Sequence, residues 1–485
     1  MSADPQIIPW SNPKYLAHHV VRAYNNPECT GSPTETLFWG DDVLGAEREG
    51  DKTRFLLTGE RIRWAKGNLE LLDVPPLALL FLDVGQGDAC LITTPGGSRI
   101  LIDGGENKLA ARYLAQRYRH ETVAGAQVLF DAVVVTHGDA DHFEGLSILV
   151  LDAAEHERKH IRFATKRVYH NGLVKRPVSQ PGGSARPERE MLGPSVQLED
   201  GTWAVSELID DPRALPDTEL NKHFLRWKTA LEALAGRHSL EVRRIDDTSS
   251  NAFDFAPEVK FEILGPRTIQ LADKSTGMKM MGATEGGAPS SAKTINGHSI
   301  TLKLTYGRAR ILLTGDLTKE SADALLSLHN EKHLDLVSEV LKVPHHGSND
   351  FSIPFLTAVH PAVSIISAGD ENALRDHMHP RANVVGALGK AGRGDEPLIF
   401  VTNLSAFDAY AGPAFRAKKM GDDLYTPDLD KPMFYARERI VYGRIFVRTD
   451  GEQLFIARMG AKGYEAYVFQ LAEDSTPVHM PLRRL

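Results

Sequence analysis

Three things are scarce in this chain of 485 residues: cysteine, long apolar runs and an excess of positive charge. Only Cys29 and Cys90 occur, so the chain has no disulfide framework, and a reducing compartment is favoured. No apolar run reaches the roughly 18 residues that a membrane-spanning helix needs. The net charge of −8 gives no global attraction for nucleic acid, so any phosphate-binding surface has to be local.

The N-terminus also lacks the charged and then apolar form of a secretory signal peptide. With 42% apolar and 25% charged residues, the composition is typical of a globular protein that can bury one large core and a second small one. We therefore expect a cytoplasmic protein without a membrane partner. The sequence predicts no particular oligomeric state.

The pattern of the chain predicts one large domain flanked by two smaller regions. Residues 1–76 are predicted to be an N-terminal extension, either a small β module or a lid. Residues 77–470 are predicted to form one catalytic domain of α/β class, because strand-like and helix-like segments alternate in it. An irregular stretch at about 152–292 is predicted to be an insertion, with a flexible loop over 175–195. Residues 471–485 are predicted to be a tail.

The most informative segment is Val133-Val-Val-Thr-His-Gly-Asp-Ala-Asp-His142. Its valines predict the end of a buried strand, and the chain then turns at Gly138. Two carboxylates this close would lose their charge if they were buried alone, whereas a cation stabilises both. Imidazole mixed with carboxylate suits zinc, manganese or iron. An exposed polar loop is the alternative. The candidate ligands are His137, Asp139, Asp141 and His142.

Three further strand-like segments end in residues of the same kind. Asp103 follows one, Asp316 follows the apolar run Ile311-Leu-Leu, and His345-His346 follows another. Because α/β folds usually build their sites at the carboxyl ends of strands, we expect these side chains to converge. Two alternatives stay open: Asp316 capping the next helix, and the histidine pair lying in the core.

Taken together, these segments resemble the metallo-β-lactamase fold, and specifically the hydrolase domain of the ComEC family, whose full-length members are DNA-uptake channel proteins. The resemblance implies a four-layer αβ/βα sandwich with a two-metal site at one edge. The membrane helices of the channel are missing from this sequence. In family order, from residue 78 to about 460, the matching segments are Phe81-Leu-Asp-Val-Gly-Gln-Gly-Asp88, Leu101-Ile-Asp-Gly-Gly105, Thr136-His-Gly-Asp-Ala-Asp-His142, Leu313-Thr-Gly-Asp316, Lys342-Val-Pro-His-His-Gly-Ser348, His379-Pro380 and Val447-Arg-Thr-Asp-Gly451.

The resemblance also implies a role for each candidate ligand. His137 and Asp139 would hold the first metal, and Asp141 and His142 the second. Asp316 would bridge the two ions. One histidine of the His345-His346 pair would complete the second site, and Asp103 would orient a ligand through a hydrogen bond.

Two positions depart from the wider superfamily. Asp139 stands where that superfamily has a histidine, and Asn296-Gly-His-Ser299 stands in place of its third histidine motif. Asparagine is a weak ligand, so we expect a loosely held or absent first metal, unless His298 substitutes. The additional carboxylate shifts the metal preference from zinc towards manganese.

These residues lead to the hypothesis of a metal-dependent hydrolase in which one or two divalent ions, zinc or manganese, hold a bridging hydroxide. A phosphodiester is the expected substrate, with DNA as one case. Asp141, Asp316 and His379 are the expected catalytic residues, and Ser348 and Asn349 the candidates for binding phosphate. Two other functions stay open: hydrolysis of a small ester or lactone, and a catalytically weakened regulatory protein that binds metal.

Overall fold

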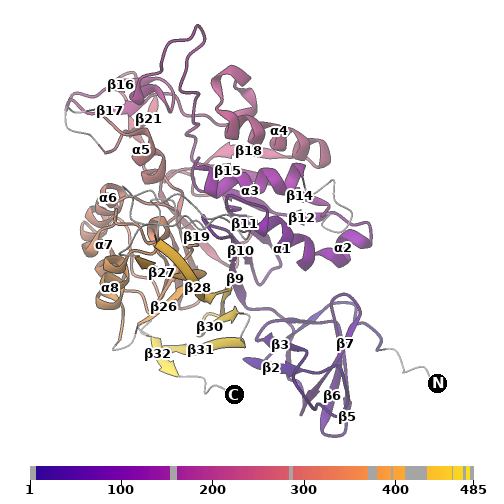
Figure 1. The fold of residues 1–485 in the computed structure, drawn as a ribbon. Coiled ribbons are helices and arrows are strands. Elements are labelled where there is room, and N and C mark those ends of the chain that lie inside the picture. Colours follow the sequence, from indigo (N-terminus) through magenta and orange to yellow (C-terminus); the bar gives the residue numbers. More distant parts are fainter. Residues whose placement is uncertain are drawn as a thin grey trace, which may run out of the picture.

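Two β-sheets lie face to face at the centre of the protein, and helices cover both outer faces (Figure 1). The structure is a computed structural model. It describes residues 7–152, 161–282, 288–369, 379–394, 397–409, 434–460, 463–472 and 477–480.

The first sheet has ten strands in the order β18-β15-β13-β11-β10-β9-β29-β30-β31-β32. Strands β11, β13, β15 and β18 are parallel, whereas those from β10 through β32 pair antiparallel. The strands are β9 (Leu77–Phe81), β10 (Cys90–Thr93), β11 (Arg99–Ile102), β13 (Ala132–Val135), β15 (Arg167–His170), β18 (Glu241–Arg244), β29 (Arg444–Thr449), β30 (Gln453–Gly460), β31 (Gly463–Leu471) and β32 (Pro477–Met480).

The second sheet has six strands in the order β19-β22-β23-β24-β25-β26. From β23 to β26 the strands are parallel, so their carboxyl ends lie at one edge. The strands are β19 (Lys260–Gly265), β22 (Thr301–Tyr306), β23 (Ala309–Leu313), β24 (Val340–Lys342), β25 (Val363–Ile366) and β26 (Leu398–Val401).

The helices pack on the outer faces of the two sheets, with α1, α3 and α4 beside the first sheet and α6, α7 and α8 beside the second (Figure 1). α5 lies near the junction of the two halves, and α2 follows α1. The helices are α1 (Leu109–Arg117), α2 (Arg119–Val123), α3 (Ala140–Leu151), α4 (Lys222–Arg237), α5 (Ser291–Gly297), α6 (Lys319–Asn330), α7 (Ile353–Val359) and α8 (Ala382–Ala391). Among the described residues, no helix is both long enough and apolar enough to cross a bilayer.

Alternation of side chains along the buried strands produces the layers. On β13, Val133 and Val135 pack with the helices, while Val134 packs between the sheets. On β23, Leu312 packs with the outer helices, while its neighbours Ile311 and Leu313 face the first sheet. Because successive strand residues point to opposite faces, a strand that is apolar throughout has to be covered on both sides. The predicted four-layer α/β arrangement is therefore confirmed.

The N-terminal region is all β, with its own small core, and packs against the end of the first sheet that the helices leave uncovered (Figure 1). Phe38 and Trp39 contact Phe455 of β30. The buried guanidinium of Arg448, on β29, donates to the carbonyl oxygens of Phe38 and Trp39 and pairs with Asp41 at 2.6 Å. The strands are β1 (Lys14–Leu16), β2 (Val20–Ala23), β3 (Glu35–Phe38), β4 (Asp42–Val43), β5 (Gly45–Glu49), β6 (Lys52–Leu57), β7 (Arg61–Lys66) and β8 (Leu71–Leu72).

The predicted insertion at 152–292 is too broad, because this stretch supplies β15 and β18 to the first sheet and β19 to the second. β15 and β18 have only four residues each, and β18 is rich in charge, so these two strands lack the apolar run that marks a buried strand. A separate four-stranded sheet does come from this stretch. It consists of β16 (Ser195–Gln197), β17 (Trp203–Val205), β20 (Ile269–Gln270) and β21 (Thr276–Lys279).

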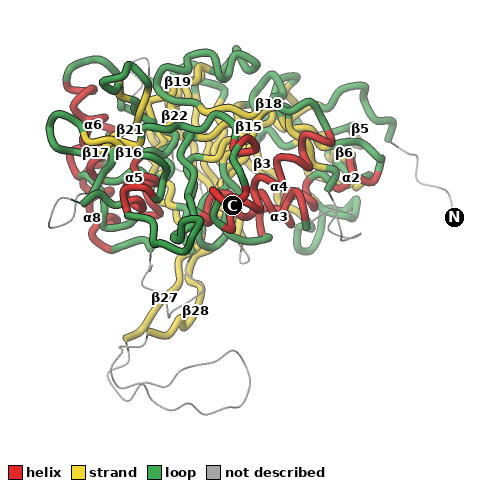
Figure 2. Tube along the Cα trace, turned by 90° about the horizontal axis from the view of Figure 1, so that it is seen from above, coloured by secondary structure: helices red, strands yellow, loops and turns green. Residues whose placement is uncertain are grey.

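Two other segments also differ from expectation or stand apart. The predicted tail at 471–485 contributes β32, which pairs with β31, so it is not a simple tail. A hairpin of β27 (Asn403–Ala409) and β28 (Phe434–Tyr442) projects from the body (Figure 2). One more two-stranded pair, β12 (Val128–Phe130) with β14 (Phe163–Thr165), lies beside the first sheet.

Candidate metal centre

Strand ends from both sheets meet between the two halves of the fold, as the sequence predicts. Asp103 follows β11 and the loop of residues 136–142 follows β13, both in the first sheet. Asp316 follows β23 and the His345-His346 pair follows β24, both in the second. The predicted site residues therefore follow four separate strands, and the sheet topology brings them together.

A compact group of imidazoles and carboxylates forms where these loops meet. The Oδ2 atom of Asp316 lies 3.4 Å from Nε2 of His142 and 3.0 Å from Nε2 of His346. The Oδ2 atom of Asp141 lies 3.4 Å from the same nitrogen of His346. The ring of His137 is 4.0 Å from that of His142, centroid to centroid. All of these side chains are buried except that of Asp141, which is 22% exposed.

Hydrogen bonds on the far side of two histidine rings decide which nitrogen faces the centre. Nδ1 of His142 lies 2.8 Å from Oδ2 of Asp103, and Nδ1 of His346 lies 2.9 Å from the carbonyl oxygen of Ser367. Both partners are acceptors, so each Nδ1 carries the proton and each Nε2 presents a lone pair. Asp103 is held in turn by the backbone N–H and the hydroxyl of Thr136, at 2.8 and 2.7 Å.

The donor set fits a divalent cation. Nε2 of His137, His142 and His346 and Oδ1 of Asp316 are buried and have no hydrogen-bond partner. Lone pairs that face one another in a buried site are stabilised only by a proton or a metal ion. Ligating histidines commonly donate their other N–H to a carboxylate or a carbonyl, as His142 and His346 do here. Among the described residues, four sets of donor atoms each lie within 4.8 Å of one another. Two of them are His137, His142 and Asp316, and Asp141, His142 and His346; the other two include Asp88.

The electrostatics of the buried group point the same way. Burial alone would lower the pKa of His346, but Asp316, Asp141 and Asp88 together raise it well above its usual value. Burial likewise opposes ionisation of Asp316, yet His346 and His142 hold its pKa well below the ordinary range. Burial lowers the pKa of His137, and His142 lowers it further. The surroundings of His346 and Asp316 therefore favour positive charge, which a bound cation supplies as well as a proton does, whereas His137 is kept neutral.

Unusual backbone conformations set the direction of the ligands. Asp103, His345 and His346 have φ values of 57°, 48° and 53°, in the left-handed region that non-glycine residues rarely adopt. Each costs on the order of 1–3 kcal/mol and persists only when the surroundings hold it. The turn at residues 344–347 directs Nε2 of His346 to Asp316, while Nε2 of His345 lies 3.9 Å from the same carboxylate and its side chain is 24% exposed.

Close backbone contacts also fix the loops. A Cβ added to Gly87 would lie 1.8 Å from the carbonyl oxygen of Asp141. A Cβ added to Gly145, on α3, would lie 2.0 Å from the carbonyl oxygen of Gly104. Only glycine allows both approaches, which bring the loop before β10 and the loop after β11 against the start of α3.

Asp139 is not brought into the metal-ligand group. Its Oδ1 accepts a hydrogen bond from Nζ of Lys175, and it belongs to none of the potential metal clusters among the described residues. Asp139 occupies the N-cap position of α3, where the backbone is extended, and its side chain points towards the segment that follows β15. The structure therefore pairs Asp139, a predicted ligand of the first metal, with a lysine rather than with the other candidate ligands.

The remaining candidates divide into two groups. Asn296 lies beside the centre, with Nδ2 3.5 Å from Nε2 of His345 and a buried Oδ1 that has no hydrogen-bond partner. The ring of His379 is 6.2 Å from that of His345. Ser348 follows the histidine pair and accepts a hydrogen bond from the backbone N–H of Asp350, and Asn349 is exposed.

His298, in contrast, cannot substitute for the missing histidine. Its Nε2 lies 2.8 Å from the carbonyl oxygen of Lys279, away from the centre. Burial lowers its pKa to about 4, so the ring is neutral and donates this hydrogen bond. The residue ends α5 rather than lying in a strand, so strand alternation does not apply to it.

Three residues at the centre were missed in the sequence. Asp88 lies with Oδ1 3.4 Å from Nδ1 of His346, and its other oxygen pairs with Lys342. Lys342 also donates to the carbonyl oxygen of Gly315 at 2.9 Å. Gln86 donates to Oδ2 of Asp141 at 3.2 Å. Gln86 and Asp88 belong to the Gly85-Gln-Gly-Asp88 turn, and Lys342 is the first residue of the histidine-pair motif. These two motifs could therefore have pointed to the three residues.

The basic residues of the 166–176 segment do not form an open basic track. Lys166 pairs with Asp131 at 2.7 Å and Arg167 with Glu241 at 3.6 Å. Arg176 pairs with two glutamates and Lys175 with Asp139. These cations therefore give no separate support for binding of a nucleic-acid backbone.

Comparison with known proteins adds relatives in sequence. No family model matches the chain. The chain is 24% identical over 320 residues to ComE operon protein 3 of Bacillus subtilis (strain 168), covering 63% of this chain and 30% of that protein. It is 38% identical over 104 residues to competence protein ComA of Neisseria gonorrhoeae, covering 21% of this chain and 15% of that protein. The chain thus spans less than a third of the length of either relative.

Solved structures that resemble the chain are distant. One is the metallo-beta-lactamase fold protein YhfI from Bacillus subtilis, at 8% identity and a TM-score of 0.29, covering 67% of this chain and 96% of that one. Another is a long form of RNase Z from yeast, at 9% identity and a TM-score of 0.23, covering 67% of this chain and 37% of that one. Scores this low carry no argument, so the fold assignment rests on the topology and motifs described above.

The four-layer αβ/βα arrangement, with histidines and aspartates converging at the strand ends, is the one expected from the resemblance to the metallo-β-lactamase fold. In sequence, part of the chain is similar to competence protein ComA and to ComE operon protein 3.

Proposed function

We propose that the protein is a metal-dependent phosphodiesterase, with DNA as the leading substrate. The observation that supports it best is the group of buried, unsatisfied Nε2 and carboxylate atoms between the two sheets, which a divalent cation would satisfy. The similarity to competence proteins favours a nucleic-acid substrate over a lactone or a small ester. Neither zinc nor manganese is favoured by geometry alone.

Asp141, His142, His346 and Asp316 are the proposed metal ligands, with His137 as a further one. A divalent cation held there would polarise a phosphoryl oxygen and lower the pKa of water, so that a nucleophile forms near neutral pH. Asp103 keeps the proton of His142 on Nδ1 and so keeps Nε2 available. Lys342, paired with Asp88 and 3.6 Å from Asp316, holds a fixed positive charge behind the ligands.

The partly exposed side of the centre is the proposed place for the substrate. His345 is 24% exposed on its side chain, and His379 lies beside it. Either imidazole is in reach to hold a proton for the leaving oxygen. Ser348 and Asn349, which follow the histidine pair, are the proposed contacts to a phosphate oxygen.

The test is a hydrolysis assay with metal-depleted protein reconstituted with manganese, zinc or magnesium. Linear, circular and single-stranded DNA are compared with a chromogenic phosphodiester, and Asp141→Asn serves as the matched inactive variant. We expect hydrolysis that requires metal and is lost in D141N. A protein that binds metal tightly but cleaves none of these substrates would instead support the regulatory alternative, which the asparagine at position 296 and the pairing of Asp139 favour.

A further inference from the structure

We propose that the ammonium group of Lys175 takes the place of one of the two metal ions expected for this fold, so that the centre binds a single divalent cation. The proposal rests on the proposed function in one respect only, namely that a metal ion binds to Asp141, His142, His346 and Asp316. It concerns the other side of the loop of residues 136–142, where a first metal was expected on His137 and Asp139.

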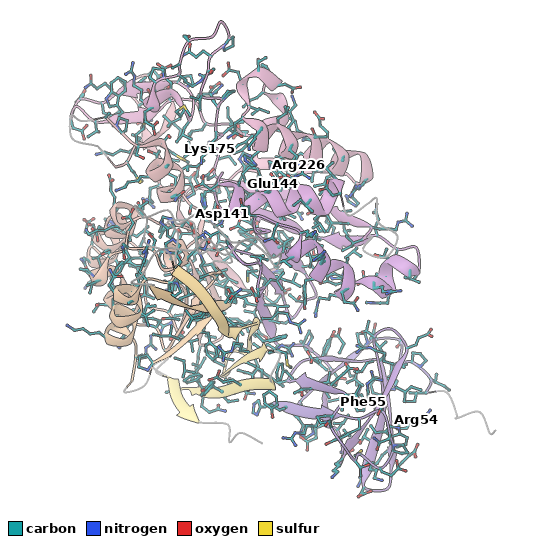
Figure 3. The ribbon with its side chains drawn as sticks, viewed as in Figure 1. Arg54, Phe55, Asp141, Glu144, Lys175 and Arg226 are labelled. Carbon is teal, nitrogen blue, oxygen red and sulfur yellow. The ribbon has the colours of Figure 1, made fainter. Side chains whose placement is uncertain are left out.

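The ammonium group of Lys175 lies beside the carboxylate of Asp139. Nζ of Lys175 donates to Oδ1 of Asp139, the carboxylate that stands where the superfamily has a metal-binding histidine. In Figure 3, Lys175 lies on the same side of the α3 and α4 layer as Asp141, where the two halves of the fold face each other. A second cation on Asp139 would have to bind where the ammonium already lies.

Lys175 is held in place by its backbone. It follows β15, the neighbour of β13 in the first sheet, so the two strands deliver Lys175 and His137 to the same edge. The carbonyl oxygen of Lys175 accepts a hydrogen bond from the N–H of Asn221, at the N-cap of α4. The next residue, Arg176, is buried and pairs with Glu207 and Glu219.

The loop that carries Asp139 is equally confined. A Cβ on Gly138 would lie 2.6 Å from the ring of Phe224 and 2.8 Å from Ile295, so the loop is packed between α4 and α5. The backbones that carry Asp139 and Lys175 are therefore both confined by their neighbours. Two cations that share one carboxylate oxygen at close range repel each other, and the repulsion grows in a partly buried site.

Few strong donors remain on this side. The position of the third histidine motif holds Asn296, whose amide is a poor ligand, and His298 is engaged with the carbonyl oxygen of Lys279. Among the described residues, His137 shares its one potential cluster with His142 and Asp316, and both of these also belong to other clusters. Without Asp139, His137 is therefore the one strong donor left for a separate ion on this side. A lysine ammonium is stabilised by a few hydrogen-bond acceptors, whereas a metal ion requires a full set of ligands.

The experiment counts metal ions and requires no turnover. Full-length protein is titrated with manganese to millimolar concentration, with stoichiometry from elemental analysis and isothermal titration calorimetry and pairing of ions from electron paramagnetic resonance. The variants are Lys175→Met, which removes the charge, and Lys175→Arg, which retains it. Lys166→Met, which breaks another lysine–aspartate pair of the same segment, is the matched control. Circular dichroism checks the fold of each variant.

We expect one ion per chain in the unaltered protein, in K175R and in K166M, and a second ion in K175M that is lost again in the double variant K175M with Asp139→Asn. Two magnetically coupled ions in the unaltered protein would overturn the inference, and so would a folded K175M that still binds one. If no variant binds metal at all, the proposed function itself fails. If two ions bind and phosphodiesters are cleaved, only the role of Lys175 fails.

Discussion

The two ends of the loop of residues 136–142 present the same kind of side chain to opposite environments. Asp141 and His142 face Asp316 and His346 across the gap between the sheets, and their donor atoms lack hydrogen-bond partners or lie close to another ligand. Asp139 faces Lys175, whose ammonium donates a hydrogen bond to one of its carboxylate oxygens. The difference shows that the surroundings of an aspartate, and not only its place in a motif, decide whether its carboxylate is available to a metal ion.

The largest effect that separates the two ends is expected from Asp316→Asn. The carboxylate of Asp316 lies close to Nε2 of both His142 and His346, so its negative charge would help to hold the cation proposed to bind there. Hydrolysis should fall on the order of 10³-fold or more, as for loss of a charge-stabilising group in an active site. Steady-state kinetics on the best phosphodiester measures it, with the exposed Asp200→Asn as control. Activity within twofold of the control would contradict the proposed role of Asp316 as a metal ligand.

The second effect distinguishes the two neighbouring histidines. His346 is buried, with Nε2 3.0 Å from Asp316, whereas the ring of His345 lies at the partly exposed side. His346→Asn should weaken metal binding by about 100-fold, and His345→Asn by less than about tenfold, within the range known for residues around metal ions. Calorimetric dissociation constants provide the measurement. The reverse order would mean that the left-handed turn orients the pair differently.

A smaller effect is expected one layer behind the metal. Asp103→Asn keeps the shape of the side chain but replaces one acceptor oxygen beside Nδ1 of His142 with an amide donor. Metal affinity should fall by about 10–100-fold, because the ring loses its fixed tautomer and direction. Competition with a chromogenic chelator measures the affinity. An unchanged dissociation constant would count against the ligand role of His142.

Removal of metal gives a further test of the same side. A cation bound only by the folded state stabilises it by about 4 kcal/mol at a concentration 1,000 times its dissociation constant. Chelation should therefore lower the melting temperature by several degrees, because loss of the ion leaves the buried Nε2 atoms without a partner. Differential scanning calorimetry with and without chelator measures the shift, and D316N should show none.

The smallest effect on metal is expected from His298→Gln. His298 donates to the carbonyl oxygen of Lys279 and does not reach the centre. The variant should bind metal within about twofold of the unaltered protein, while stability falls by about 1 kcal/mol for the altered buried hydrogen bond. Calorimetry measures the first quantity and urea unfolding the second. A large loss of metal affinity would restore His298 as a candidate ligand.

The layered fold and the meeting place of the site could be predicted, because both follow from local pattern and topology. Runs such as Val133–Val135 and Ile311–Leu313 are apolar on both faces, which requires a covered parallel strand. Parallel strands share an edge, so Asp103, His137 and Asp316 were expected to converge. Strands β15 and β18 escaped prediction because they are short and partly charged.

The direction of individual side chains could not be predicted. Asp139 points away from the other candidates because Lys175 lies opposite it, and Lys175 comes from a stretch with no regular pattern. His298 points away because α5 extends to Gly297, so helix geometry rather than strand alternation directs it. Asp88 was part of a recognised turn, but only its pairing with Lys342 and His346 shows its place in the centre.

The docking of the N-terminal strands onto β29 and β30 has a practical consequence. A shortened chain that begins at residue 77 would leave Phe455 and its apolar neighbours open to water, and the Arg448 guanidinium without the acceptors it now has in Phe38, Trp39 and Asp41. Such a truncation would aggregate rather than yield a minimal enzyme. Residues 77–480 should therefore be expressed and engineered together with the N-terminal strands, which cover the outer face of β29 and β30.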